Sequence, residues 1–472
     1  MRIALMHYHM RPGGVSTVIR DQYDALSAEH RCIVLSGELP EEGHAEEWPG
    51  SVRVVPELGY SADRSTRPDP GRMADAVVDA MRSEWGRVAD ILHVHNPTLD
   101  KNHGLLRCLR LLAGRGIRIF AQVHDFAEDG RPGVIYPPQE DYPRDCHYGV
   151  INSRDREALL SSGLSAEGVH LMFNRVRSPA GAPFPGPPPG RRILYPVRGI
   201  RRKNLGEALL VGTLLGAEVT VSLPPRDPAD LQRFKGWTVF AETHGLPARF
   251  GAGLAEPLAT LLSRAHATLT TSVNEGFGFA FLEPWPAGRE VLGRRVPHVC
   301  RDFEAAGMRF PSLYSSLPVP TGLFDSRSLE HRWSRAVSHA LRRFGRRVDA
   351  RVMAKAWSER TDGASFDFSF LDEEAQREVL TRVLADKAAR KSVEDGLPML
   401  ASLRSALLRP DAALVESNAE IVRRRYGQEE YARLLGTIYR QVLEVNVRHS
   451  IDRERLLDCF LRPGELRMIE GR

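Results

Sequence analysis

Two glutamates lie eight residues apart in a short segment of the chain, Asn274 to Glu283, and two glycines are among the residues between them. The carboxylates of Glu275 and Glu283 can accept hydrogen bonds from the hydroxyls of a sugar or a ribose. Gly276 and Gly278 let the backbone approach a ligand closely, and we expect a helix to begin after them and to offer its first N–H groups to an anion such as a diphosphate. The segment therefore predicts a site for a sugar joined to phosphate. A solvated glutamate beside an ordinary glycine turn is the alternative.

Two basic residues that could neutralise a diphosphate follow an apolar segment at 192–197, which we expect to be a strand. Arg198 and Lys203 stand five residues apart, and a guanidinium with an ammonium would stabilise the charge that grows on a leaving diphosphate. Arg201 and Arg202 are rival cations, so the sequence leaves open which arginine faces the phosphate. A solvated basic loop is the alternative interpretation.

Glycines and a histidine follow strands that we predict in the first half of the chain. The strand expected over 2–7 leads into Gly13 and Gly14, where a helix begins, and the strand over 118–123 leads into His124. Ligands of open α/β sheets bind at the carboxyl ends of the strands. These residues are therefore candidates for ligand contact. The alternatives are an ordinary β–α turn and a structural histidine.

The glutamate segment resembles the E-x7-E element of retaining glycosyltransferases with the GT-B fold, in particular those of family 4. The glycine loop at 11–16, His124, the Arg198 and Lys203 pair and a tyrosine-containing helical tail over 416–443 resemble further elements of that family, in its order. The resemblance implies an α/β fold with two Rossmann-like domains that face a cleft. It also implies transfer of a hexose from a nucleoside-diphosphate sugar to a hydroxyl acceptor, a small molecule or a glycan.

The resemblance implies which residues do the chemistry. It places Glu283 on the ribose and Glu275 on the hexose of the donor, with His124 contacting the hexose from the other domain. The residues implied in catalysis are His124, Arg198, Lys203 and Glu275. The residues implied in donor binding are Gly13, Gly14, Gly276, Phe277, Gly278, Phe279 and Glu283.

The implied mechanism retains the anomeric configuration and uses neither a metal nor a cofactor. The leaving diphosphate accepts the proton of the acceptor hydroxyl, so a carboxylate nucleophile is unnecessary. Cationic side chains take the place of a divalent ion, and no Asp-x-Asp element follows a predicted strand in the second half of the chain. The base and hexose of the donor and the identity of the acceptor stay open.

Other functions remain as alternatives. A sugar-nucleotide epimerase or a phosphorylase shares the fold, and a non-catalytic protein that binds a nucleotide or a partner is an alternative from a different class. His93 and His95 share one face of a predicted strand and could suggest a metal pair. No third ligand with suitable spacing follows, so we favour a structural or acceptor-side role for them.

The chain departs from the family pattern in its second half. Asn204 stands where the family has a glycine, and Pro284 and Pro286 should shorten or kink the helix after the second glutamate. Residues 326–410 are charged and amphipathic, which predicts an inserted or extended helical segment. Its role stays open between closing over the cleft, mediating dimerisation and packing on the back of the domain.

Composition shifts and proline clusters predict the domain organisation. We expect residues 1–178 to form an N-terminal Rossmann-like domain, 179–190 a proline-rich linker, and 191–410 a C-terminal domain that includes the helical segment at 326–410. The resemblance implies that the first domain holds the acceptor and the second the donor. Residues 411–472 are C-terminal helices that pack back on the domains.

Alternating strand and helix patterns predict a parallel sheet in each half. The strands are expected near 2–7, 31–36, 52–55, 91–95, 118–123, 149–152, 169–173, 192–197, 218–222, 237–240 and 267–271. In the first half, helices are expected at 15–28, 71–88, 102–114 and 153–162.

The overall composition favours a cytoplasmic enzyme. The 472 residues include 65 basic and 60 acidic side chains, a balance that does not indicate nucleic acid. No run of eighteen apolar residues predicts a membrane span, although the arginine-rich stretch at 341–347 leaves peripheral membrane contact open. Five scattered cysteines predict no disulfide framework. The sequence does not specify the oligomeric state.

Overall fold

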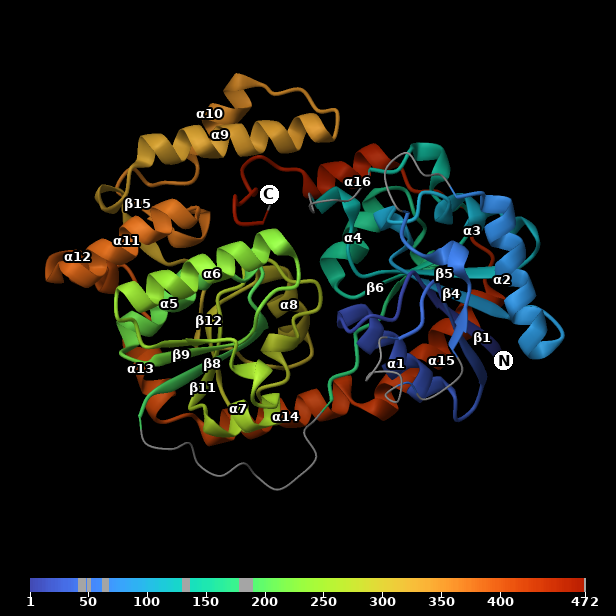
Figure 1. Ribbon diagram of the computed structural model, residues 1–472, viewed down its shortest axis with the longest axis horizontal. Coiled ribbons are helices and arrows are strands. Elements are labelled where there is room, and N and C mark those ends of the chain that lie inside the picture. Colours follow the sequence, from blue (N-terminus) through green and yellow to red (C-terminus); the bar gives the residue numbers. More distant parts are fainter. Residues whose placement is uncertain (41–47, 49–51, 62–67, 130–135, 178–189, 471–472) are drawn as a thin grey trace. The chain divides into compact units, whose positions relative to one another are not determined.

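The computed structural model describes residues 1–40, 48, 52–61, 68–129, 136–177 and 190–470 (Figure 1). The chain divides into two compact units, the first comprising Met1–Arg175 with Tyr426–Leu461, and the second comprising Val176–Arg425 with Arg462–Arg472. The predicted linker at 179–190 lies, except for Gly190, outside the described residues. The predicted C-terminal region at 411–472 is shared between the two units.

The first unit is built on a parallel sheet of seven strands in the order β3-β2-β1-β4-β5-β6-β7. The strands are β1 (Arg2–His7), β2 (Arg31–Ser36), β3 (Val52–Val54), β4 (Ile91–His95), β5 (Arg118–Val123), β6 (His147–Val150) and β7 (Val169–Leu171). The helices are α1 (Gly14–Leu26), α2 (Pro70–Trp85), α3 (Leu105–Gly114), α4 (Ser153–Ser161), α15 (Gln428–Glu444) and α16 (Arg453–Phe460).

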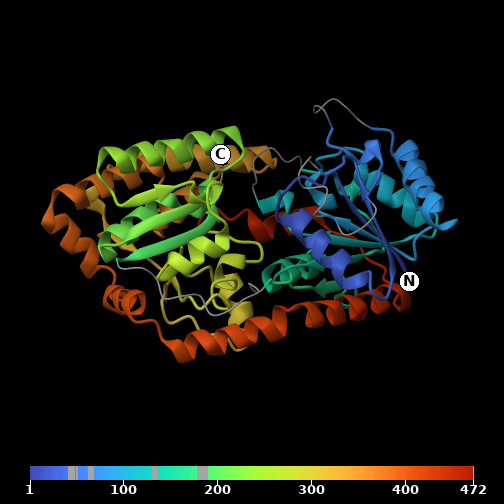
Figure 2. The same cartoon turned by 60° about the horizontal axis from the view of Figure 1, so that its bottom comes forward.

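Helix α15 completes the first unit although it comes from the far end of the sequence. Its apolar face packs beside α1, as both views show (Figures 1 and 2), and Ile438 and Tyr439 join a buried cluster with Ile3 and Ile19. Burial of that apolar stripe drives the association, because residues three and four apart share one face of a helix. The tail therefore covers the sheet that carries the N-terminal candidates.

The second unit is built on a parallel sheet of six strands in the order β10-β9-β8-β11-β12-β13. The strands are β8 (Arg192–Arg198), β9 (Glu218–Leu223), β10 (Ala248–Phe250), β11 (Ala267–Thr270), β12 (Val291–Arg294) and β13 (Leu313–Tyr314). The helices are α5 (Leu205–Leu215), α6 (Pro228–Thr243), α7 (Leu258–Arg264), α8 (Pro297–Ala305), α9 (Ser326–Arg343), α10 (Ala350–Ser358), α11 (Glu373–Ala385), α12 (Lys387–Asp395), α13 (Leu400–Leu408) and α14 (Ala412–Tyr426). A two-stranded antiparallel sheet pairs β14 (Pro318–Pro320) with β15 (Ser365–Asp367).

One predicted strand is wrong, because 237–240 lies inside α6. The run Trp-Thr-Val-Phe has the residue types of a strand. The helix wins because Asp227 caps it by accepting hydrogen bonds from two backbone N–H groups, and Pro228 occupies its first position. Phe234, Trp237 and Ala241 are then buried on one helical face.

The segment at 326–410 contains the helices expected from its pattern. Helices α11 and α13 contact α5, and α12 contacts β14 (Figure 1). Helices α9 and α10 meet through Trp333 and Trp357, whose ring centroids are 5.3 Å apart. The start of α11 reaches the loop that follows β8, because Glu373 pairs with Arg201 at 2.6 Å.

A buried ion network joins four elements of the second unit. Arg294, at the end of β12, binds Glu207 of α5 at 2.7 Å and Asp367 of β15 at 2.6 Å, and its side chain is only 3% exposed. The hydroxyl of Tyr314 donates a hydrogen bond to Glu207 at 2.8 Å. Arg294 is therefore the cation that both buried carboxylates share.

None of the helices within the described ranges is long and apolar enough to cross a membrane. All five cysteines carry free thiols.

Candidate functional site

Two loops of the second unit meet at the carboxyl ends of β8 and β11. Arg198 ends β8, and a 3-10 turn over Arg201–Lys203 leads into α5. The hydroxyl of Thr271, just after β11, donates hydrogen bonds to the backbone oxygens of Lys203 and Asn204, each at 3.0 Å. The two loops are therefore fixed to each other at the edge where open α/β sheets bind ligands.

Lys203 and Glu275 form an ion pair that joins these loops across 72 positions of sequence. The two side chains are only 12% and 9% exposed. Burial alone would raise the pKa of Glu275, but the charges of Lys203 and Arg202 outweigh it and hold that pKa below its usual value. Glu275 is therefore ionised at neutral pH. His298 donates a hydrogen bond to its backbone oxygen at 2.8 Å.

Asn204 adopts a left-handed conformation, with φ 54° and ψ 58°. Asparagine tolerates this region better than other residues with a Cβ, and glycine is the usual occupant. Its side chain donates to Glu207 at 2.7 Å and accepts from Gln376 at 2.9 Å. The departure from the family's glycine therefore preserves the turn that ends at Lys203.

The helix expected after Gly278 does not form, and that prediction is wrong. The segment makes one 3-10 turn over Phe279–Phe281 and continues in turns. Pro284 and Pro286 each lack an N–H and clash with a continuing helix. Gly278 has φ +91°, and an added Cβ would lie 2.5 Å from a side-chain carbon of Val299. A helix dipole therefore contributes nothing at this loop, and the cationic side chains carry the positive charge.

Glu283 lies in the turn after that 3-10 segment and is half-buried. Burial raises the pKa of its carboxyl group to about 7. Within the described part of the chain, no residue pairs with or hydrogen-bonds to this carboxylate. A half-buried carboxylate that has no protein partner is available to accept hydrogen bonds from a ligand.

The rival arginines differ in their partners. Arg201 makes a two-point ion pair with Glu373 of α11, at 2.6 and 2.7 Å. Arg198 donates one hydrogen bond to the backbone oxygen of Pro224 at 3.1 Å and has no carboxylate partner within the described ranges. Burial and the charge of Arg226 lower the pKa of Arg198, so additional negative charge beside it would be favourable.

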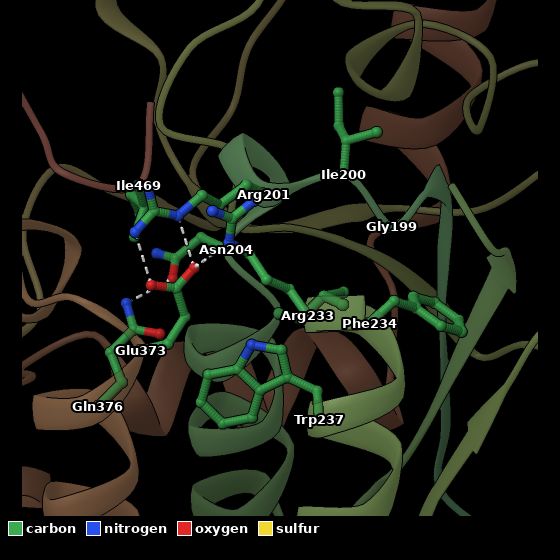
Figure 3. A pocket seen from close by; sticks show the side chains of 11 residues that line it. Gly199, Ile200, Arg201, Asn204, Arg233, Phe234, Trp237, Glu373, Gln376 and Ile469 are labelled. Atoms are coloured by element: carbon green, nitrogen blue, oxygen red, sulfur yellow. Dashed lines mark hydrogen bonds and ion pairs between the residues drawn. The ribbon is translucent and has the colours of Figure 1, made fainter. Parts of the chain in front are cut away.

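A small pocket lies beside the Arg201 turn (Figure 3). Its polar groups are paired with one another, because Arg201 and Arg233 face Glu373 and Gln376 bonds to Asn204. None of the residues predicted to bind the donor lines it. The residues that line it are Gly199, Ile200, Arg201, Asn204, Leu205, Arg233, Phe234, Trp237, Glu373, Gln376 and Ile469.

Gly13 and Gly14 lie at the start of α1 in the first unit. Gly13 is extended, with φ −178°, and a Cβ added there would lie 3.8 Å from its nearest neighbour, the backbone oxygen of Arg11. An added Cβ at Gly14 meets nothing within 4 Å. Neither backbone conformation nor packing requires glycine at these positions. The space beside them is open, and a pocket there is lined by Met10, Pro12, Gly13, Ser16, Thr17, Arg20 and Trp48.

His124 follows β5 and is only 6% exposed. The side-chain oxygen of Asn96 accepts a hydrogen bond from the His124 backbone N–H at 2.7 Å. Nε2 of His124 lies 3.0 Å from Nδ1 of His95. Burial lowers the pKa of His124 to about 4, so its ring is neutral at pH 7. Asn96 was not predicted, although it follows β4 as His124 follows β5.

His93 and His95 are fully buried in the first sheet. His93 lies 2.7 Å from the hydroxyl of Tyr439 and 3.0 Å from the side-chain oxygen of Gln122. In the ranges that the structure describes, no group of three or more His, Cys, Asp or Glu side chains could hold a metal ion.

The chain matches no model of a protein family. It is 24% identical to the mannosylglucosyl-3-phosphoglycerate synthase of Petrotoga mobilis (strain DSM 10674 / SJ95) over 341 residues, which cover 64% of this chain and 66% of the relative. The chain thus spans slightly less than two thirds of that relative.

Two solved structures resemble nearly the whole chain. HepE of Anabaena in complex with UDP-glucose has a TM-score of 0.54 at 11% identity and covers 93% of this chain and 100% of its own. A glycosyltransferase from Rickettsia africae ESF-5 has a TM-score of 0.54 at 11% identity and covers 94% of this chain and 98% of its own. The chain has the GT-B fold. The fold predicted from the sequence is thereby confirmed, and so is the resemblance to glycosyltransferases.

In this GT-B chain both groups of candidates follow the carboxyl ends of parallel strands. Arg198, Lys203 and Glu275 do so in the second unit, with Glu283 further along the same loop as Glu275. Gly13, Gly14 and His124 do so in the first unit. His298 and Thr271 were missed, because nothing in their spacing marks them.

Proposed function

We propose that this GT-B chain is a retaining glycosyltransferase that moves a hexose from a nucleoside-diphosphate sugar to a hydroxyl acceptor. The observation that carries the proposal is the buried pair of Lys203 and Glu275. A buried ion pair contributes little to folding stability compared with apolar packing, so its position at a ligand-binding edge supports a functional role.

The cations of the second unit are assigned to the donor diphosphate. Lys203 and Arg198 contact its oxygens and stabilise the charge that grows as it leaves. Arg201 is excluded from this role because Glu373 already binds its guanidinium at two points. Glu275 accepts a hydrogen bond from a hexose hydroxyl while it stays ionised beside Lys203.

The remaining candidates are assigned to the ribose, the phosphates and the hexose of the donor. Glu283 accepts hydrogen bonds from the ribose diol, which supplies the partner that its carboxylate lacks in the protein. Gly13 and Gly14 leave open space for the donor phosphates, and His124 contacts the hexose.

The proposed reaction needs no covalent intermediate with the protein. The acceptor oxygen attacks the anomeric carbon on the face that the diphosphate leaves, and the bond from that carbon to the diphosphate oxygen breaks. The proton of the acceptor hydroxyl passes to the departing diphosphate. We propose that no metal or cofactor is required, since Arg198 and Lys203 supply the positive charge. Transfer should then be unchanged by EDTA.

The relative in Petrotoga mobilis, whose name describes the synthesis of a phosphoglycerate glycoside, supports a proposal for the acceptor class. We propose an acidic glycoside acceptor, and glucosyl-3-phosphoglycerate is the first compound to test.

The experiment incubates the protein with a panel of nucleotide sugars, with and without acceptor, and follows nucleoside diphosphate by chromatography. We expect one donor to release its diphosphate only when acceptor is present, and NMR of the product to show the donor's anomeric configuration. Conversion of the donor without acceptor would identify an epimerase instead. Release of sugar 1-phosphate from a glycan incubated with inorganic phosphate would identify a phosphorylase, and binding without turnover a non-catalytic protein.

Donor affinity is expected to rise about ten-fold between pH 6 and pH 8, because ribose hydroxyls bond best to ionised Glu283, whose pKa is about 7. Calorimetry with an intact nucleotide sugar is the measurement, since its diphosphate does not titrate in this range. Glu283→Gln should bind more weakly and without this pH dependence. An equally steep profile in the variant would contradict the assignment.

The Glu283 carboxyl affects the stability of the unliganded protein in the opposite direction, because rising pH strengthens donor binding but lowers the free energy of unfolding. Its folded pKa of about 7 exceeds the ordinary value of 4.5, so the folded chain binds this proton more tightly than the unfolded chain. The stabilising contribution of Glu283 is therefore fully present below about pH 4.5 and is lost as the pH rises through 7.

A further inference from the structure

The turn that carries Lys203 is held from the side by helix α11, which lies about 170 residues later in the chain. Glu373, the first residue of α11, accepts two hydrogen bonds from the guanidinium of Arg201, at 2.6 and 2.7 Å. The side chains of Arg201 and Glu373 are 17% and 16% exposed. A two-point contact of this kind fixes orientation as well as distance.

A second bond from α11 holds the other end of the same turn. Gln376 is 1% exposed and donates to the side-chain oxygen of Asn204 at 2.9 Å. Asn204 is the left-handed residue that directs the chain from Lys203 into α5. An added Cβ at Gly206 would lie 2.2 Å from the side-chain oxygen of Gln376, so a larger residue at this position would displace that side chain.

Backbone bonds within the turn place Lys203 between these two points. Its N–H donates to the oxygen of Ile200 at 3.0 Å, and the N–H of Asn204 donates to the oxygen of Arg201 at 3.0 Å. Figure 3 shows Glu373 and Gln376 side by side below the turn, with Arg201 and Asn204 facing them. The turn is therefore fixed on both sides of Lys203 by one helix.

We infer that Glu373 and Gln376 are positioning residues for the donor diphosphate, which hold the turn of Arg201–Lys203 so that Lys203 stays directed at the phosphate and at Glu275. The inference rests on the proposed function of Lys203. It gives a role to the start of α11 within the segment at 326–410. It also makes Arg201 a structural anchor for the turn, which leaves Arg198 and Arg202 as the arginines that can face the phosphate.

The test compares Glu373→Gln, Arg201→Gln and the double variant with the wild-type protein, by calorimetric titration of the nucleotide sugar that the wild type binds. Because the two side chains act as one contact, we expect each single variant to weaken binding by about three-fold to ten-fold, and the double variant by no more than either single change. Glu374→Gln is the matched control, since Glu374 is the next residue on α11 and pairs instead with Arg332 at 3.1 Å. It should bind as the wild type does.

Hydrogen exchange gives a readout that does not depend on activity. We expect the backbone N–H groups of residues 199–205 to exchange faster in Glu373→Gln and in the double variant, and to be unchanged in Glu374→Gln. The double variant removes both charges of the Arg201–Glu373 contact, and Arg233, which lies 3.7 Å from Glu373, still pairs with Asp230 at 3.5 Å. It therefore keeps the test valid if a single variant fails to fold.

Two outcomes would overturn the inference. Unchanged donor binding in Glu373→Gln together with weakened binding in Arg201→Gln would make Arg201 a direct phosphate ligand. Unchanged exchange at 199–205 in the double variant would show that α11 does not hold the turn. If the wild type binds no nucleotide sugar, the proposed function fails, and the exchange result still decides whether α11 holds the turn.

Discussion

Replacing Glu275 with glutamine is expected to lower the rate of hexose transfer by about 100-fold to 1,000-fold, the usual effect of losing one preorganised charged group at a reacting centre. The change removes the negative charge that pairs with Lys203 and weakens the acceptor for the hexose hydroxyl. Initial rates of nucleoside diphosphate release, with donor and acceptor both saturating, measure the effect.

The control for this prediction is Glu256→Gln in the same unit. Glu256 pairs with Arg249 at 2.7 Å and also with Arg264, and neither arginine belongs to the loops after β8 and β11. Transfer by this variant should equal that of the wild type. A Glu275→Gln protein that transfers hexose within about three-fold of the wild-type rate would remove Glu275 from the site.

Arg294→Met is expected to lower the free energy of unfolding by about 3–5 kcal/mol, because it leaves two buried carboxylates without their cation. The Glu207 side chain is 0% exposed and that of Asp367 is 13% exposed, so water cannot replace the lost partner well. Equilibrium unfolding in urea, followed by tryptophan fluorescence, measures the change.

Arg249→Met supplies the comparison, since it removes an arginine whose side chain is 48% exposed and whose ion pair lies at the surface. Its effect should stay within about 1 kcal/mol. Equal unfolding free energies for the two variants would mean that the network around Arg294 does not hold the second sheet together.

The alternation of strands and helices could be predicted because each element carries its own pattern. The strands at 2–7, 31–36, 118–123 and 267–271 match the structure within one residue. The predicted strand at 237–240 was wrong. Its residue types favour a strand, but the cap at Asp227 and burial on a helical face stabilise a helix there. Local propensity determined the secondary structure of a segment where no capping or tertiary effect opposed it.

The sequence names the candidate residues of the site one by one, but it does not predict the contacts among them. Lys203 and Glu275 were named for separate reasons, and the structure adds that they pair and are buried. The helix expected after Gly278 was wrong because Pro284 and Pro286 permit only a 3-10 turn. The contact of Glu373 with Arg201 left no signal in the sequence, because 172 residues separate the two positions.

The most direct test of the donor site is a thermal-shift measurement of the wild type, Glu283→Ala and Arg198→Ala against nucleoside diphosphates and nucleotide sugars, without added metal. A ligand at one hundred times its dissociation constant stabilises a folded protein by about 2.7 kcal/mol. We predict that one nucleoside series raises the melting temperature of the wild type and that both variants lose most of that shift. No shift with any nucleotide, or equal shifts in all three proteins, would contradict a donor site at these residues.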